Sequence, residues 1–241
     1  MCEYCVDAGR GRLSRRAFVS GVAGLAAAAA ALPRLALAEQ QSAPQNAIAP
    51  SEALKRLVDG NARYVANAPN TRDFSAGRAA RTQGQYPIAA ILSCADSRVA
   101  PELAFDQGPG DLFVVRVAGN VSTPEGLASL EYGVRFLSIP LVMVLGHTSC
   151  GAVGAAIKTV EDGAVLPGHL PDLVDAIEPA VVAAKAGNPA DLLTAATVEN
   201  VRVAKNAIRK GSAIMAEAAD TGRIEIVGGV YDLKTGAVAM I

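Results

Sequence analysis

Three short apolar runs most constrain the fold of this chain. They occupy Ile88–Ser93, Leu112–Arg116 and Leu141–Gly146, and each is nearly continuous in apolar residues rather than alternating. Strands of this kind are buried on both faces, which is typical of a parallel sheet with helices on either side. Helical patterns follow the second and third runs, at Pro124–Phe136 and Ala152–Val160. We therefore predict an α/β fold with a central, mostly parallel β-sheet flanked by helices.

Periodicity and turn residues predict the other elements. Ser51–Asn67 has apolar residues at helical spacing, with Ser51 as the expected N-cap. Ser122 and Glu125 form an expected capping box before the helix at Pro124–Phe136. Further elements are expected in chain order as helices over Asp172–Lys185 and Asp191–Ala219, a strand over Arg223–Tyr231 and a final strand ending at Ile241.

Composition indicates a globular protein. Of the 241 residues, 51% are hydrophobic and 19% are charged, which is outside the range of disordered chains. The length suits a single main domain, and no internal repeat is visible. The net charge of −1 gives no electrostatic reason to expect a nucleic-acid partner, and we expect none.

Residues 1–38 differ in character from the rest of the chain. The pair Arg15-Arg16 ends a basic region, and the uncharged, Ala-rich run Ala17–Leu32 is shorter than the roughly 20 residues that span a bilayer. Ala36-Leu37-Ala38 is a small-x-small cleavage pattern, so we expect a signal peptide at 1–38. The arginine pair resembles the twin-arginine export signal, which implies a partner in the export machinery and a periplasmic or secreted protein. A Sec signal or an uncleaved anchor is the alternative.

After this segment we expect a flexible lead at 39–50 and one folded domain at 51–241. The chain has four cysteines. Cys2 and Cys5 lie upstream of the signal and have no assigned role. Cys94 and Cys150 remain in the exported chain, where a disulfide between them is one alternative.

The residues around these two cysteines favour a metal site instead. Cys94 directly follows the apolar run Ile88–Ser93, and His147 and Cys150 follow the run Leu141–Gly146. Because ligands in parallel sheets lie beyond the carboxyl ends of strands, the three side chains can converge. Two thiolates and one imidazole are zinc ligands, and a three-residue set leaves a fourth position open, as in catalytic sites. We predict one zinc ion per chain.

Two further residues of the first loop predict a reaction at that zinc. Asp96 lies two residues after Cys94 and offers an oxygen close to the open position. Arg98 lies two residues further on and can hold that carboxylate with a two-pronged hydrogen bond. A purely structural zinc site needs neither residue, so this pair argues against a non-enzymatic zinc or thiol module.

The two metal-binding segments resemble the signature motifs of a known family. Cys94-Ala95-Asp96-Ser97-Arg98 and His147-Thr148-Ser149-Cys150-Gly151 are similar to the two motifs of β-class carbonic anhydrases. The resemblance runs from about Ser51 to Ile241 and implies a β-carbonic anhydrase-like fold. The supporting segments are Gly60–Tyr64, Gly110–Arg116, Ala118–Asn120 and Ser129–Gly133.

The resemblance implies a role for each matching residue. Cys94, His147 and Cys150 would bind zinc, and Asp96 and Arg98 would form the catalytic dyad. The implied reaction is the reversible hydration of CO2 to bicarbonate and a proton by attack of a zinc-bound hydroxide. In an inactive state of some members, Asp96 would become the fourth zinc ligand. The implied substrate-binding residues are Gln85, Phe113, Tyr132 and Gly151.

In this family the pocket straddles a subunit interface, so the resemblance also implies a homodimer or a higher even homo-oligomer. A carbon disulfide or carbonyl sulfide hydrolase on the same scaffold is the alternative enzyme. The allosteric bicarbonate site of some members includes a Trp, and this chain has no Trp.

Overall fold

The computed structural model describes residues 44–241. The predicted signal peptide at 1–38 and the start of the predicted lead therefore lie outside the described residues. Asn46 is buried, and its side-chain amide donates to the carbonyl oxygen of Leu137 at 2.6 Å. Within 44–241, no helix combines the length and the apolar character that crossing a membrane requires.

A five-stranded sheet is the centre of the described fold, with strand order β2-β1-β3-β4-β5. The first four strands along the chain are mutually parallel, and β5 pairs with β4 in the antiparallel sense. The prediction of an α/β fold with a mostly parallel sheet is confirmed. The strands are β1 (Ala89–Ser93), β2 (Leu112–Arg116), β3 (Leu141–His147), β4 (Glu225–Tyr231) and β5 (Val238–Met240).

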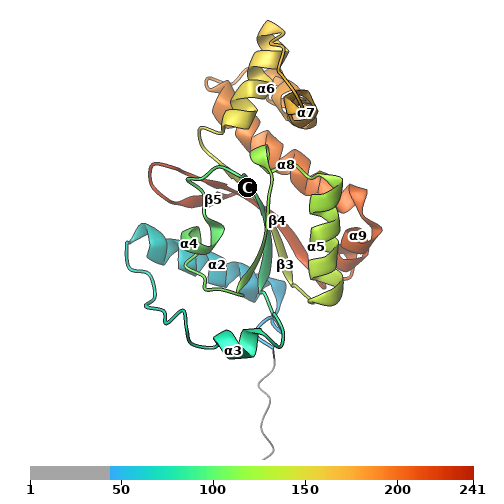
Figure 1. Ribbon diagram of the computed structural model, residues 1–241. Coiled ribbons are helices and arrows are strands. Elements are labelled where there is room, and N and C mark those ends of the chain that lie inside the picture. The colour runs from blue at the N-terminus through green and yellow to red at the C-terminus, as the bar shows by residue number, and fades with distance from the viewer. Residues whose placement is uncertain (1–43) are drawn as a thin grey trace, which may run out of the picture. The chain divides into compact units, whose positions relative to one another are not determined.

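Helices cover both faces of this sheet (Figure 1). On one face α2 (Pro50–Val65) and the short α4 (Pro101–Ala104) pack on strand residues such as Ile91. Residues that alternate with these, such as Leu92, face the opposite core. That core is completed by α5 (Pro124–Phe136), α8 (Leu192–Gly211) and α9 (Ala213–Asp220), while α3 (Arg78–Arg81) lies in the loop before β1.

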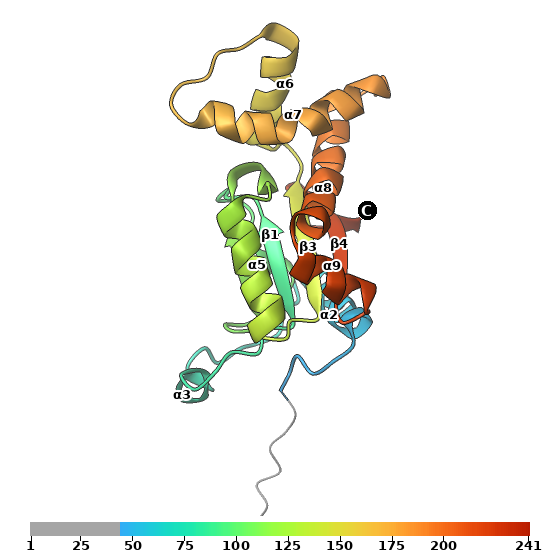
Figure 2. The same ribbon diagram turned by 90° about the vertical axis from the view of Figure 1, so that its right-hand side faces the viewer.

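Two helices lie beyond the carboxyl ends of the strands (Figure 2). They are α6 (Gly151–Asp162) and α7 (Leu170–Ala186), and they pack on each other and on α8. A third hydrophobic core forms between them, and its buried residues include Cys94 and Cys150. The 3₁₀ turn η1 (Ala118–Asn120) follows β2 and also contacts this region. The predicted metal ligands are therefore enclosed by helices at one end of the sheet.

Two predicted N-caps are wrong, and one predicted helix is two helices. Helix α2 begins at Pro50 with Ala49 as N-cap, so Ser51 lies inside the helix; proline suits a first turn because its ring fixes φ near the helical value. The N-cap of α5 is Thr123, whose side chain accepts from Gly126 N, rather than Ser122. The helical stretch expected over Asp191–Ala219 is broken at Ser212, which caps the second helix.

Candidate metal centre

Three side chains from two loops meet at the carboxyl ends of β1 and β3. Cys94 is the first residue after β1, His147 is the last residue of β3, and Cys150 is the N-cap of α6. Because β1 and β3 are hydrogen-bonded neighbours, their ends are adjacent. The sulfur atoms of the two cysteines and a ring nitrogen of His147 lie within 4.8 Å of one another. Both cysteines are free thiols, so the disulfide alternative is not what the structure contains.

The imidazole of His147 has the orientation and tautomer that suit binding of a metal ion through Nε2. Its Nδ1 lies 2.9 Å from the carbonyl oxygen of Thr148, which fixes the proton on Nδ1 and leaves Nε2 as the lone-pair nitrogen. The ring is fully buried, and among residues 44–241 its Nε2 has no hydrogen-bond partner. A buried polar atom without a partner is costly, and a cation bound between this nitrogen and two sulfurs accounts for it. These residues therefore fit zinc.

The two sulfurs share a network that favours negative charge. A hydrogen bond from the Cys150 thiol lowers the pKa of Cys94 to about 4, against the opposing effect of burial, and His147 adds to the lowering. The same bond and burial raise the pKa of Cys150, while the N–H groups of Val153 and Ala152 in the first turn of α6 partly offset this. Two thiolates side by side thus need a cation, because otherwise one proton stays between them.

Asp96 is held beside the ligands by Arg98. Arg98 Nε donates to Asp96 Oδ1 at 2.9 Å, and Nη2 donates to Oδ2 at 2.7 Å. The backbone N–H of Arg98 also donates to Oδ1, at 2.9 Å. These bonds hold the pKa of Asp96 well below its usual range. Asp96 Oδ2 lies 3.8 Å from His147 Nε2, so an ionised carboxylate stands at the edge of the ligand cluster.

Arg116 also supports the loop of Cys94 and Asp96, a role that the residue spacing did not predict. It ends β2, and its Nε donates to the Cys94 carbonyl at 3.0 Å while Nη2 donates to the Asp96 carbonyl at 2.6 Å. The guanidinium therefore fixes the backbone of the loop that carries a ligand and the carboxylate. Its position at the carboxyl end of a strand next to β1 was the available signal.

The pocket residues implied by the resemblance divide into two groups. Gly151 follows the ligand Cys150 and opens α6. Phe113 instead pairs with Ala90, four residues before Cys94, which places it about 13 Å away along the sheet. Tyr132 stacks on Phe113 with ring centroids 6.5 Å apart.

Gln85 is exposed and precedes β1, whereas the metal ligands follow that strand. Within one chain, then, Gln85, Phe113 and Tyr132 are not brought to the metal ligands. Tyr132 is also 48% exposed.

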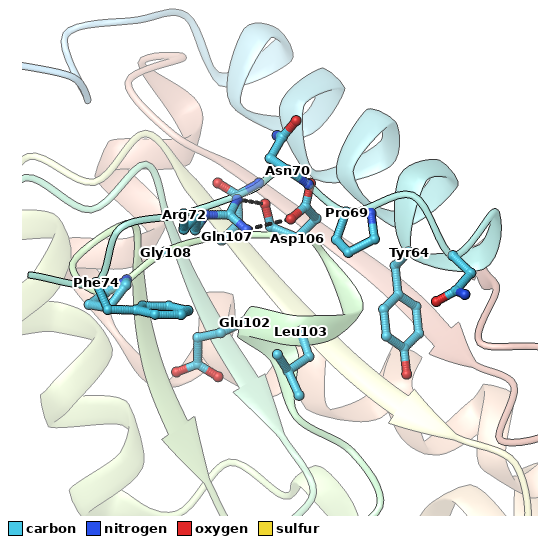
Figure 3. Close-up of a pocket in the computed structure, with 12 residues that line it drawn as sticks. Tyr64, Pro69, Asn70, Arg72, Phe74, Glu102, Leu103, Asp106, Gln107 and Gly108 are labelled. Carbon is cyan, nitrogen blue, oxygen red and sulfur yellow. Dashed lines mark hydrogen bonds and ion pairs between the residues drawn. The ribbon is translucent and has the colours of Figure 1, made fainter. Parts of the chain in front are cut away.

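A separate groove of about 550 Å³ lies beside α2 and α4 (Figure 3). Tyr64, Phe74 and Leu103 supply its apolar walls, and Arg72 binds the buried Asp106 at its rim. None of the predicted site residues lines this groove. It is thus distinct from the metal centre.

The fold and the site together define an α/β protein with a Cys-His-Cys metal centre and an adjacent carboxylate–arginine pair. The sequence profile of the carbonic anhydrase family matches residues 89–238. A carbonic anhydrase of Mycolicibacterium smegmatis is 43% identical over 194 residues, which is 79% of this chain and 93% of that protein. Carbonic anhydrase 2 of Mycobacterium tuberculosis is 40% identical, over 79% of this chain and 92% of that protein.

Solved structures agree with this assignment. The β-carbonic anhydrase CcaA is 27% identical with a TM-score of 0.59, covering 78% of this chain and 87% of that one. The β-carbonic anhydrase CafA of Aspergillus fumigatus has the same fold, with a TM-score of 0.60 at 23% identity over 79% of this chain and 89% of that one. The chain belongs to the carbonic anhydrase family and is an enzyme of the β class.

Proposed function

We propose that this chain catalyses the reversible hydration of CO2 to bicarbonate and a proton with one zinc ion held by Cys94, His147 and Cys150. The unpartnered, buried Nε2 of His147 beside two thiol sulfurs is the observation that carries this proposal. Zinc in this position would supply the nucleophile by lowering the pKa of a water molecule.

The residues around the metal explain how the chain would use that nucleophile. Asp96 is ionised and can accept a proton and a hydrogen bond at the open position. Arg98 occupies both oxygens of this carboxylate, which keeps Asp96 off the metal. This arrangement supports an open site, and release of Asp96 from Arg98 would be the route to a closed one.

We further propose that the substrate pocket is completed by a second copy of the chain in a homodimer or higher even oligomer. Gln85, Phe113 and Tyr132 lie toward the opposite end of the sheet from the metal ligands of their own chain. The half-exposed Tyr132 and the 71% exposed Phe136 form an aromatic surface on α5, with ring centroids 5.3 Å apart. Packing that surface against another subunit would bring these residues toward the partner's metal centre.

Stopped-flow measurement of CO2 hydration by the zinc-loaded protein tests the proposed reaction. We expect hydration that disappears with a chelator and returns with zinc. Carbon disulfide and carbonyl sulfide should be assayed in parallel, because a hydrolase on this scaffold would share the ligands. Rapid turnover of either sulfur compound without CO2 hydration would contradict the proposal, as would an inactive zinc-loaded protein.

We also propose that the protein is exported from the cytoplasm. The Arg15-Arg16 pair and the Ala-rich run after it support export by the twin-arginine route into the periplasm or the medium. Twin-arginine export carries folded proteins, so zinc would be bound before the chain crosses the membrane.

A further inference from the structure

The turn η1 brings a backbone donor to the metal centre. Gly119 N–H donates to Cys94 Sγ at 3.2 Å. The turn is tied to the strand that leads to this ligand, because Val117 N–H donates to the carbonyl of Ser93 at 3.0 Å. A hydrogen bond to a ligating sulfur changes how much charge that sulfur gives to a metal. The position of η1 therefore affects the charge on the Cys94 sulfur as well as the packing around it.

Helix α8 holds the other side of Gly119. Asn200 Nδ2 donates to the carbonyl oxygen of Gly119 at 2.7 Å, across a separation of 81 residues in sequence. The side chain of Asn200 is buried, and the interaction lies away from solvent. Two hydrogen bonds in series thus connect Asn200 to the sulfur of Cys94 through a single residue.

Gly119 has little freedom to move elsewhere. Its φ is +68°, a left-handed conformation that favours glycine. An added Cβ would lie 2.6 Å from Ile177 Cδ1 and 3.2 Å from Ala152 Cβ, so α7 and α6 enclose the turn. These neighbours are apolar and set only how closely the turn packs. Asn200 supplies a directional bond to the Gly119–Asn120 peptide, which directly follows the Ala118–Gly119 peptide whose N–H binds Cys94.

We propose that Asn200 is a positioning residue for the metal centre. By binding the Gly119 carbonyl, it holds the Gly119 N–H on Cys94 Sγ and sets the charge that this sulfur donates to the metal. Asn200 is buried and acts through Gly119 rather than on a reacting atom. The inference rests on the proposed zinc site and adds a residue that acts on it from the far side of the turn.

Two variants of the full chain test this role. Asn200→Leu removes the donor with a side chain of similar size. Thr197→Val is the matched control, because Thr197 is equally buried one turn earlier on α8 and its hydroxyl bonds the Leu193 carbonyl rather than η1. Zinc dissociation constants from chelator competition and the sulfur-to-cobalt charge-transfer band of Co²⁺-substituted protein are the two measurements.

We expect Asn200→Leu to weaken zinc binding about 10-fold, the lower end of effects seen for residues that orient metal ligands. Its charge-transfer band should move to longer wavelength, because a thiolate that loses a hydrogen bond has higher-energy lone pairs. Thr197→Val should leave both readings close to those of the unmodified protein. If Asn200→Leu does not fold, Asn200→Ala should shift both readings in the same directions.

Unchanged readings in a folded Asn200 variant, with normal zinc binding by the unmodified chain, would overturn this inference and leave the proposed function standing. Equal shifts in Thr197→Val would also overturn it, because the effect would then be general to packing of α8. An unmodified chain that binds no zinc would overturn the proposed function and this inference with it.

Discussion

Arg98 donates hydrogen bonds to both carboxylate oxygens of Asp96, with Nε 2.9 Å from Oδ1 and Nη2 2.7 Å from Oδ2. A pair of parallel bonds of this kind fixes the plane of the carboxylate as well as its position. The guanidinium also reaches toward the Ser149 carbonyl at 3.5 Å, in the loop that carries Cys150. The pair therefore links the loop after β1 to the loop that carries Cys150, and it keeps the Asp96 carboxylate beside the Cys94-His147-Cys150 cluster.

Mutations can distinguish the role of Asp96 and Arg98 from the role of the proposed metal ligands. Asp96→Asn keeps the shape of the side chain but removes the proton acceptor, and Arg98→Ala frees the carboxylate to approach the metal. We expect both variants to fold and retain zinc while CO2 hydration falls at least about 10-fold, or roughly 1.4 kcal/mol in barrier terms. Stopped-flow rates and zinc content should be measured on the same samples.

Arg56→Ala is a control for this pair, since it breaks an exposed Arg56–Glu52 ion pair on α2 and should leave the rate unchanged. An Asp96→Asn variant with near-normal activity from neutral to alkaline pH would show that Asp96 does not accept the proton.

Loss of a ligand should act differently from loss of the dyad. Cys150→Ala removes one of the two sulfurs and leaves Nε2 of His147 with a single sulfur partner. We expect the purified variant to contain well under one zinc ion per chain and to show no hydration, because structural and catalytic zinc need their full ligand set. Elemental analysis checks this. Full zinc occupancy in Cys150→Ala would mean that the metal is held elsewhere.

Mixing of variant subunits can test whether the pocket residues of one metal centre come from the partner subunit. Gln85→Ala should lower hydration, and Cys150→Ala should abolish it. If Gln85 serves the partner's metal centre, a mixed dimer of these two variants contains one fully intact site. We therefore expect the mixture, after subunit exchange, to be more active than the mean of its parents.

A mixture of Cys150→Ala with Asp96→Asn is the matched control for this experiment. Both defects then lie on the metal side of the pocket, so no intact site can form and no gain should appear. A gain in neither mixture would mean that Gln85 does not act across an interface.

Asp106 makes the stability of the fold depend on pH in the acidic range. Its side chain is 1% exposed and binds Arg63 and Arg72. Burial alone would raise the pKa of Asp106, but the hydrogen bonds from the two arginines outweigh it and the pKa is lowered. A carboxyl whose pKa is depressed on folding stabilises the protein above its unfolded pKa of about 3.9, and this stabilisation is lost as the pH falls through the folded value.

Asp106→Asn should therefore lower the free energy of unfolding at pH 7 by about 3 kcal/mol, since it leaves two arginines without their buried partner. The difference from the unmodified protein should shrink below about pH 4. Urea unfolding at several pH values measures both effects. Asp59→Asn, which breaks an exposed pair with Lys55, should change stability by less than about 1 kcal/mol and serves as the control.

The proposed export would depend on Arg15 and Arg16, which lie outside the described residues. Replacing Arg15 and Arg16 with Lys keeps the charge of the segment but removes the arginine pair. We expect uncleaved precursor to accumulate in the cytoplasm, as detected by fractionation and by mass. Normal export of the double Lys variant would indicate the Sec route.

The sequence by itself determined the strands of the sheet and brought forward the three side chains of the Cys94-His147-Cys150 cluster. Apolar runs of five or six residues are local signals, and β1, β2 and β3 lie where these runs predict strands. The cluster could be predicted because cysteine and histidine have few other uses at adjacent strand ends. The helix caps were predicted less well, because Ser122 and Thr123 both carry a hydroxyl that can cap a helix and Ala49 caps without any side-chain hydrogen bond.

Only the tertiary structure decided which groups support those ligands. Arg116 binds the loop of Cys94 from 22 residues away, and Asn200 reaches Gly119 from 81 residues away. Likewise, the separation of Phe113 from the metal centre follows from strand register, which periodicity leaves open. Hydrogen bonds between distant segments depend on how helices pack on the sheet. Residue spacing along the chain carries no record of that packing, so these positions could be read only from the folded protein.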